Sequence, residues 1–145
     1  MNFIDALSTS ASGLSAQRLR MNLISSNLAN INTTKTEEGG PYQRKDAVFA
    51  AESKTDDFGS HLSRSLSPGL TEVRVASVFN DNRPPIMKYD PEHPDADEEG
   101  YVGMPNINIV EEMVNMISAS RSYEANVTAI GSTKEMVNQA LEIGR

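Results

Sequence analysis

The sequence predicts a mainly α fold, in which long N- and C-terminal helices pair as a coiled coil beside a small β-containing middle domain. Three observations predict this fold. Apolar residues recur at alternating steps of four and three at both ends of the chain. Gly, Pro, Ser, Asn and Asp are frequent between the ends. Only 38% of the 145 residues are hydrophobic and none is Trp, so we do not expect a large globular core. The predicted segments are residues 1–36, 37–104 and 105–145.

A stripe of mostly apolar residues runs along the N-terminal segment. A repeat of about 3.5 residues places it on one side of a helix, and about 30 residues of helix span roughly 45 Å. A helix this long and thin is not stable alone, so we expect the stripe to pack against another helix. Seven of its nine positions are apolar: Phe3, Leu7, Ser10, Leu14, Gln17, Met21, Ile24, Leu28 and Ile31.

A second stripe with the same spacing runs through the C-terminal segment. Asn108 is a good N-cap for this helix, with Glu111 three residues later. Two such stripes at opposite ends of the chain favour pairing of the two helices. Eight of the ten positions are apolar: Ile109, Met113, Met116, Ser120, Tyr123, Val127, Ile130, Lys134, Val137 and Leu141.

The middle segment contains two runs that resemble strands, at residues 46–51 and 71–80. In the second run, Val73 and Val75 alternate with polar residues before Val78 changes the phase, which is typical of a β-bulge. We interpret the middle segment as a small β-containing insertion with long loops.

The charge of the chain argues against nucleic acid as a partner. The net charge is −7, whereas nucleic-acid binding depends on Lys and Arg that neutralise phosphates. The acidic residues concentrate between residues 90 and 99, so we tested this stretch as a calcium loop. Asp95, Asp97, Glu99 and Gly100 fit its early positions, but Asn106 stands where a bidentate Glu must close the shell. We therefore predict a solvated loop and no metal site.

The sequence also gives little support for catalysis. It contains no Cys, and its two histidines, His61 and His93, are not near a nucleophile-elbow motif. No phosphate-binding glycine loop is present. We predict no catalytic residue, no cofactor and no small-molecule substrate.

Three stretches of the sequence resemble the bacterial flagellar rod and hook family. They read SASGLSAQRLRMNLISSNLANINTT from residue 10, GGPYQRKDAVF from residue 39, and PNINIVEEMVNMISASRSYEANVTAIGSTKEMVNQALEIGR from residue 105. A fourth stretch, YDPEHPDADEEGYV from residue 89, looks specific to FlgC-type proximal rod proteins. The resemblance implies a structural subunit of the proximal rod, the drive shaft of the basal body, which assembles helically, transmits torque and is required for motility.

The resemblance also implies partners and a location. The partners are copies of the chain, other rod proteins, the inner-membrane ring and the rod-base adaptor proteins. The subunit reaches the periplasmic space through the flagellar type III export apparatus. Helix packing is implied for Leu7, Leu14, Met21, Leu28, Met113, Val127, Ile130, Val137 and Leu141, and the stripes add Phe3, Ile109, Met116 and Tyr123 to the expected assembly interface. A turn role is implied for Asn27, Asn30 and Asn32.

Two other functions fit parts of the pattern. A soluble homo-oligomeric coiled-coil adaptor shares the stripes but needs no export. A metal-dependent or serine hydrolase requires the acidic loop or His93, and loss of activity on His93→Ala would be its signature.

Overall fold

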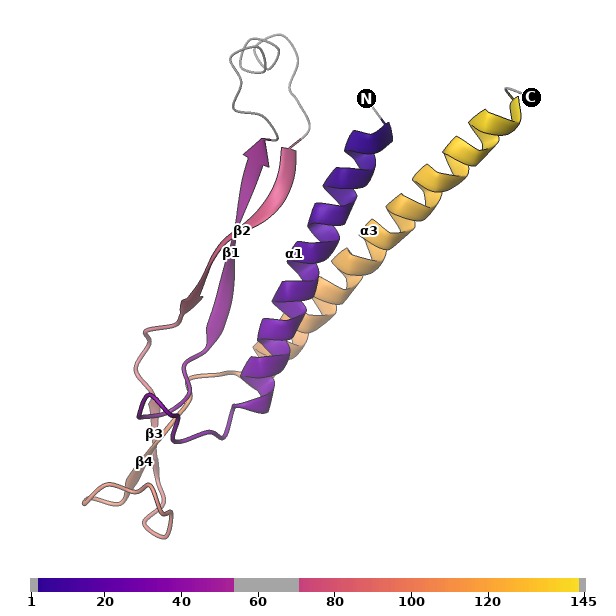
Figure 1. The fold of residues 1–145 in the computed structure, drawn as a ribbon. Coiled ribbons are helices and arrows are strands. Elements are labelled where there is room, and N and C mark those ends of the chain that lie inside the picture. Colours follow the sequence, from indigo (N-terminus) through magenta and orange to yellow (C-terminus); the bar gives the residue numbers. More distant parts are fainter. Residues whose placement is uncertain (1–2, 54–70, 144–145) are drawn as a thin grey trace.

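The computed structural model describes residues 3–53 and 71–143, which form two long helices and two small antiparallel sheets (Figure 1). The helix α1 (Phe3–Ala29) lies between the β1–β2 hairpin and the helix α3 (Ile109–Ile143). The β3–β4 hairpin lies at the end of the molecule away from the start of α1 and the end of α3. The predicted combination of long terminal helices with a small β-containing middle is therefore confirmed.

Several hydroxyl side chains of the helix α1 hydrogen-bond to carbonyl oxygens of its own backbone. Thr9 Oγ1 donates to the carbonyl oxygen of Asp5 at 2.9 Å, and Ser12 Oγ donates to that of Thr9 at 2.8 Å. At the other end, Asn30 Nδ2 donates to the carbonyl oxygen of Ser26 at 2.9 Å. The same carbonyl also accepts from the backbone N–H of Asn30 at 3.1 Å, so Asn30 closes the last turn of the helix with two bonds.

The helix α3 begins where the sequence predicts it. Asn108 Oδ1 accepts hydrogen bonds from the backbone N–H of Val110 at 3.0 Å and of Glu111 at 3.4 Å, so Asn108 is the N-cap. The helix then continues for 35 residues.

The strands β1 (Lys45–Ser53) and β2 (Thr71–Asn80) pair antiparallel and cover the two predicted runs. Val48 pairs with Ser77 and Phe49 with Val75, which leaves Ala76 as the extra residue of a bulge. The predicted change of phase before Val78 is thus confirmed.

The strands β3 (Ile86–Tyr89) and β4 (Tyr101–Met104) form a second hairpin that the sequence analysis did not predict. The rings of Tyr89 and Tyr101 meet edge to face with centroids 5.3 Å apart. Gly100 closes the intervening loop at a φ of +84°, and a Cβ there would lie 3.0 Å from the Tyr89 ring. Glycine is therefore required at this turn.

Few side chains are completely buried in the described residues. The buried apolar side chains are Ala16, Ile24, Val102, Ile107 and Ala119, and two buried polar ones, Asn27 and Glu112, lie where α1, β1 and α3 meet. The core is therefore small and centred on this junction. Within the described ranges, neither helix has a stretch apolar enough to cross a membrane.

Candidate assembly interface

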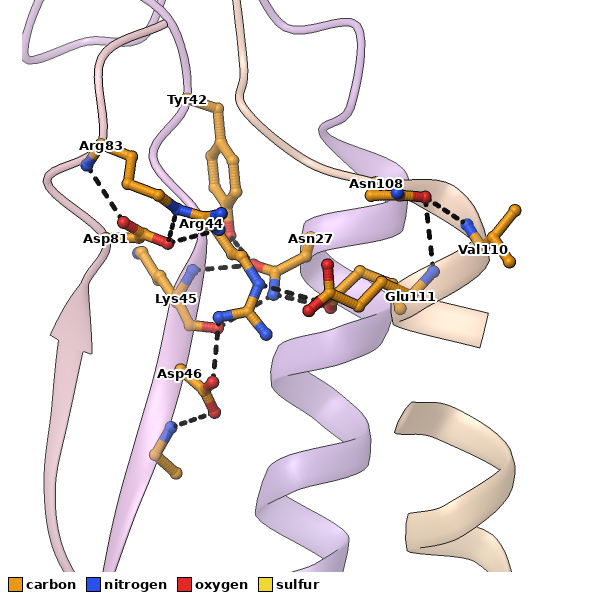
Figure 2. Close-up of polar contacts among 12 residues, drawn as sticks. Asn27, Tyr42, Arg44, Lys45, Asp46, Asp81, Arg83, Asn108, Val110 and Glu111 are labelled. Atoms are coloured by element: carbon orange, nitrogen blue, oxygen red, sulfur yellow. Dashed lines mark hydrogen bonds and ion pairs between the residues drawn. The ribbon is translucent and has the colours of Figure 1, made fainter. Parts of the chain in front are cut away.

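Asn27 connects three segments at the end of α1. Its Nδ2 donates to the carbonyl oxygen of Lys45 at 2.9 Å and to Glu112 Oε2 at 3.1 Å. Its Oδ1 accepts from the backbone N–H of Lys45 at 2.9 Å and from the Tyr42 hydroxyl at 3.1 Å. Figure 2 shows Asn27 at the centre of this network, between Tyr42, Arg44 and Lys45. One buried amide thus joins α1 to both β1 and α3.

Glu112 brings a carboxylate into the same place, with a side chain only 1% exposed. Arg44 Nε donates to Glu112 Oε1 at 2.8 Å, and Arg44 Nη1 donates to Asp46 Oδ2 at 2.9 Å. Burial lowers the Arg44 pKa, but the hydrogen bonds to Asp46 and Glu112 outweigh burial and leave that pKa above its usual value. The guanidinium therefore stays charged. We call Asn27, Tyr42, Arg44, Asp46 and Glu112 the junction cluster.

A second close contact between the helices fixes their direction. A Cβ built on Gly13 would lie 3.0 Å from Asn126 Nδ2. Gly13 and Asn27 are fourteen residues apart, as are Glu112 and Asn126, so α1 and α3 run antiparallel in constant register. Positions at seven-residue intervals share one side of each helix in such a pair. These positions, which we call the inner row, are Ala6, Gly13, Arg20 and Asn27 on α1 with Glu112, Ala119, Asn126 and Thr133 on α3.

Of the predicted stripe residues only Ile24 is buried, at 4% exposure, and Ile31 lies beyond the end of α1. In the inner row, Asn27, Glu112 and Ala119 are buried and the others are half-buried. On α1, Phe3, Leu7, Leu14, Met21 and Leu28 are half-buried. On α3, Met116, Tyr123, Ile130 and Val137 are half-buried. The other four are exposed: Ile109, Met113 (54%), Val127 (46%) and Leu141 (67%).

The two stripes lie on the same side of the helix pair. Leu14 and Leu28 each follow an inner-row residue of α1, so they lie about 100° further around that helix. Met113 and Val127 follow inner-row residues of α3 in the same way. Because the helices are antiparallel, equal rotations carry both stripes to one side of the pair. The stripes together form what we call the apolar face.

The three predicted turn residues occupy different environments. Asn27 lies in the last turn of α1 and belongs to the junction cluster. Asn30 follows the helix, and its Oδ1 accepts a hydrogen bond from Thr33 Oγ1 at 3.2 Å. Asn32 lies in the same turn and is exposed.

The acidic loop is held by hydrogen bonds within the protein. Asp97 Oδ1 accepts from the backbone N–H of Glu99 at 3.0 Å and of Tyr101 at 2.8 Å, and Asp95 Oδ2 accepts from Thr34 Oγ1 at 2.8 Å. In residues 3–53 and 71–143, no three His, Asp or Glu side chains are grouped as metal ligands. His93 is half-buried at the start of this loop, and His61 lies outside the described residues.

Sequence reasoning missed Arg44 and Glu112, which pair at the centre of the junction. The available signal was Glu112 itself, a charged residue seven before Ala119 that lies outside the predicted stripe. Arg44 carried no signal, because it meets Glu112 across 68 residues of sequence. Gly13 was missed as well, although a glycine inside a helix often marks a close approach.

Comparisons with known proteins agree with this architecture. The family model described as flagella basal body rod protein matches residues 7–35, and the model described as flagellar basal body rod FlgEFG protein C-terminal matches residues 98–143. A flagellar basal-body rod protein FlgC of Borreliella burgdorferi is 46% identical, covering 99% of this chain and 98% of the relative. The chain belongs to the FlgC family of flagellar basal-body rod proteins. FlgC proteins of Bacillus subtilis and Salmonella typhimurium are 43% and 37% identical over the whole of both chains.

Membership of the FlgC family decides between the functions considered above. The chain is a structural rod subunit of the flagellar basal body and not an enzyme. The two family models match α1 and α3, the elements that carry the apolar face, and the C-terminal one also includes β4. The adaptor and hydrolase hypotheses are therefore set aside.

Proposed function

We propose that this FlgC-family chain assembles helically into the proximal rod through the apolar face of its helix pair, and that the assembled rod transmits torque. The observation that carries the proposal is that both predicted stripes lie on one side of the pair, with Met113, Val127 and Leu141 exposed. Apolar side chains left in water at such a face gain free energy when a neighbouring subunit covers them.

The assembly is open rather than closed. A contact between two different faces of identical or similar subunits generates an open helical filament when the rotation between subunits does not close into a ring. The half-buried residues Leu7, Leu14 and Leu28 border the exposed ones, so a neighbour covers both helices at once. In the rod, α1 and α3 form a coiled-coil layer near the axis, and the β-containing segment lies further out. Close-packed long helices of this kind resist twisting.

The partners follow from the same proposal. The chain contacts copies of itself and the other rod proteins, and at the rod base it contacts the inner-membrane ring and the adaptor proteins. It reaches the periplasmic space through the flagellar type III export apparatus. Membership of the FlgC family supports these assignments, and the exposed faces of α3 and both hairpins leave room for several neighbours.

The test begins with deletion of the gene and electron cryotomography of the cells. We expect inner-membrane rings without a rod and no motility, and the wild-type gene should restore both. Leu14→Asp and Val127→Asp should fail to restore either, because a charge placed in a packed helix interface costs on the order of several kcal/mol. Rods of normal length in the deletion strain would overturn the proposal.

The control variant places the same charge elsewhere on α3. Ser118 is exposed and lies about 180° around the helix from Val127. Ser118→Asp should restore swimming to near the wild-type level if the apolar face is the main contact. Secretion of each variant into the medium should be measured too, so that loss of export is not mistaken for loss of packing. Full motility with Val127→Asp would refute the role of the apolar face.

A further inference from the structure

The helix pair turns inwards a row that is less apolar than the adjacent stripe, of which only Ile24 is buried. The inner row contains Gly13, Arg20 and Asn27 on α1 facing Glu112, Ala119 and Asn126 on α3. The adjacent stripe, one residue later on each helix, contains Leu14, Met21 and Leu28 with Met113 and Val127. Hydrophobic burial alone favours the opposite choice.

A different arrangement is open to the same two helices. A rotation of both helices by about 100° brings the two stripes together and turns the inner row outwards. Antiparallel direction and register are unchanged by this rotation. The rotated pair buries Leu14 against Val127 and Leu28 against Met113, as an ordinary coiled coil does. It also removes the apolar face from the surface.

The junction cluster opposes this rotation. Rotating α1 takes Asn27 away from the backbone of Lys45, with which it exchanges two hydrogen bonds. Rotating α3 takes the Glu112 carboxylate away from Arg44 and Asn27. Since Asn27 and Glu112 are completely buried, the groups that they leave behind would lose hydrogen bonds inside the protein.

We propose that Asn27, Arg44 and Glu112 are positioning residues that set the rotation of α1 and α3, and thereby keep the apolar face available to a neighbouring subunit. Buried polar groups fix the arrangement of helices in some coiled coils, at a cost in stability. The Gly13–Asn126 contact adds a second point of fit, since any side chain at residue 13 would meet Asn126. The two points lie fourteen residues apart and define one arrangement.

Disulfide cross-linking distinguishes the two arrangements, because the chain contains no Cys of its own. Arg20→Cys with Ala119→Cys reports the observed arrangement, since both lie in the inner row between the two contacts. Leu14→Cys with Val127→Cys reports the rotated one. Each pair is introduced into the purified full chain and into the variant Asn27→Leu/Arg44→Met/Glu112→Leu, which replaces the three polar groups by apolar ones.

The expected result is a reversal of the cross-link. The otherwise unchanged chain should form the 20–119 disulfide, and the triple variant should lose it and gain the 14–127 disulfide. A triple variant that keeps the 20–119 disulfide would show that the cluster does not set the rotation. Loss of both disulfides, or no 20–119 disulfide in the unchanged chain, would also overturn the inference, because the cluster would then only hold the chain folded.

A matched variant controls for the added apolar groups. Arg18→Met/Asn22→Leu/Glu124→Leu makes the same three kinds of change at exposed positions of the two helices. It should keep the 20–119 disulfide. The cross-linking needs no rod, so its failure is distinct from failure of the proposed function. In cells, the triple variant of the cluster should be secreted but not incorporated.

Discussion

The two ends of α3 differ in how they are held. At its start, Asn108 caps the helix, Glu112 is bound by two side chains and Ala119 is completely buried. Towards its end, Met136 and Leu141 are each more than 60% exposed and Ile143 is 87% exposed. Figure 1 shows α1 and α3 close together near the junction and diverging away from it.

The start of α3 is held by polar contacts with other parts of the chain, whereas its end shows no such contacts among the described residues and, in the proposed assembly, is left for neighbouring subunits to cover. The start of α3 is stabilised within the chain by directional polar contacts and a few buried methyl groups. The end of α3 carries apolar side chains that the described residues leave mostly exposed, as Val110 and Val114 are near its start, but it lacks the polar contacts of the start. A subunit that must bind neighbours along its length cannot bury all its apolar surface alone, so stability is concentrated at the junction.

Removal of the Glu112 carboxylate should have the largest effect on stability. Glu112→Ala removes the partner of Arg44 Nε and one of the two acceptors of Asn27 Nδ2. Removal of one member of a buried ion pair costs about 3–5 kcal/mol, and we expect the lower end of that range because Arg44 keeps Asp46. Urea unfolding of the purified chain, followed by far-UV circular dichroism, should show this loss in the free energy of unfolding.

The control is Glu124→Ala, an identical change at an exposed position of α3. It should alter the free energy of unfolding by no more than about 0.5 kcal/mol. Equal effects of the two changes would mean that the start of α3 is no better fixed than the rest of the helix.

Replacement of two helix glycines by Ala should have a smaller effect on the free energy of unfolding, and it tests how closely the two helices pack. In α3, a Cβ on Gly131 would meet nothing within 4 Å, so Gly131→Ala should raise the free energy of unfolding by about 0.5–1 kcal/mol. Gly13→Ala gains the same helix propensity but places a methyl group 3.0 Å from Asn126 Nδ2. We expect no net gain there. A stabilisation by Gly13→Ala as large as that by Gly131→Ala would show that the helices are not closely packed at this point.

The sequence predicted the elements whose apolar residues recur at a regular spacing. The spacing of Leu14, Met21 and Leu28 predicted a long helix, and the Asn108 cap predicted where α3 begins. The inner row escaped prediction because periodicity locates a side of a helix only to within about one residue, and a step of one rotates it by about 100°. The choice between the rows depends on Arg44, whose contact with Glu112 no local pattern reveals.

The hairpin β3–β4 escaped prediction for another reason. Its strands are only four residues long. The acidic stretch between them was analysed as a possible calcium loop and was predicted to be a solvated loop. The turn depends on Gly100 at positive φ and on the Asp97 carboxylate, which are contacts within the loop rather than a repeat. The spacing of the stripe was enough to predict the assembly residues on α3. It did not predict that several of them are exposed in the single chain.

The Asp81–Arg83 ion pair, which is more exposed than the Arg44–Glu112 pair, should have the smallest effect on stability. Its contribution depends on pH. Asp81 accepts hydrogen bonds from the Arg83 side chain at 2.8 Å and from the Arg83 backbone N–H at 3.0 Å, and these bonds lower the Asp81 pKa. A lowered carboxyl pKa adds stability above the usual value of about 3.9, and that stability is lost as the pH falls through the lower folded value. A carboxylate-detected NMR titration should therefore show Asp81 titrating below its usual range.

Arg83→Ala should raise the Asp81 pKa only part of the way, since the backbone bond remains. The control Arg74→Ala, which removes a partner of Glu52, should not change the Asp81 pKa. An Asp81 pKa unchanged by Arg83→Ala would mean that this pair, unlike the one at Glu112, is not formed in solution.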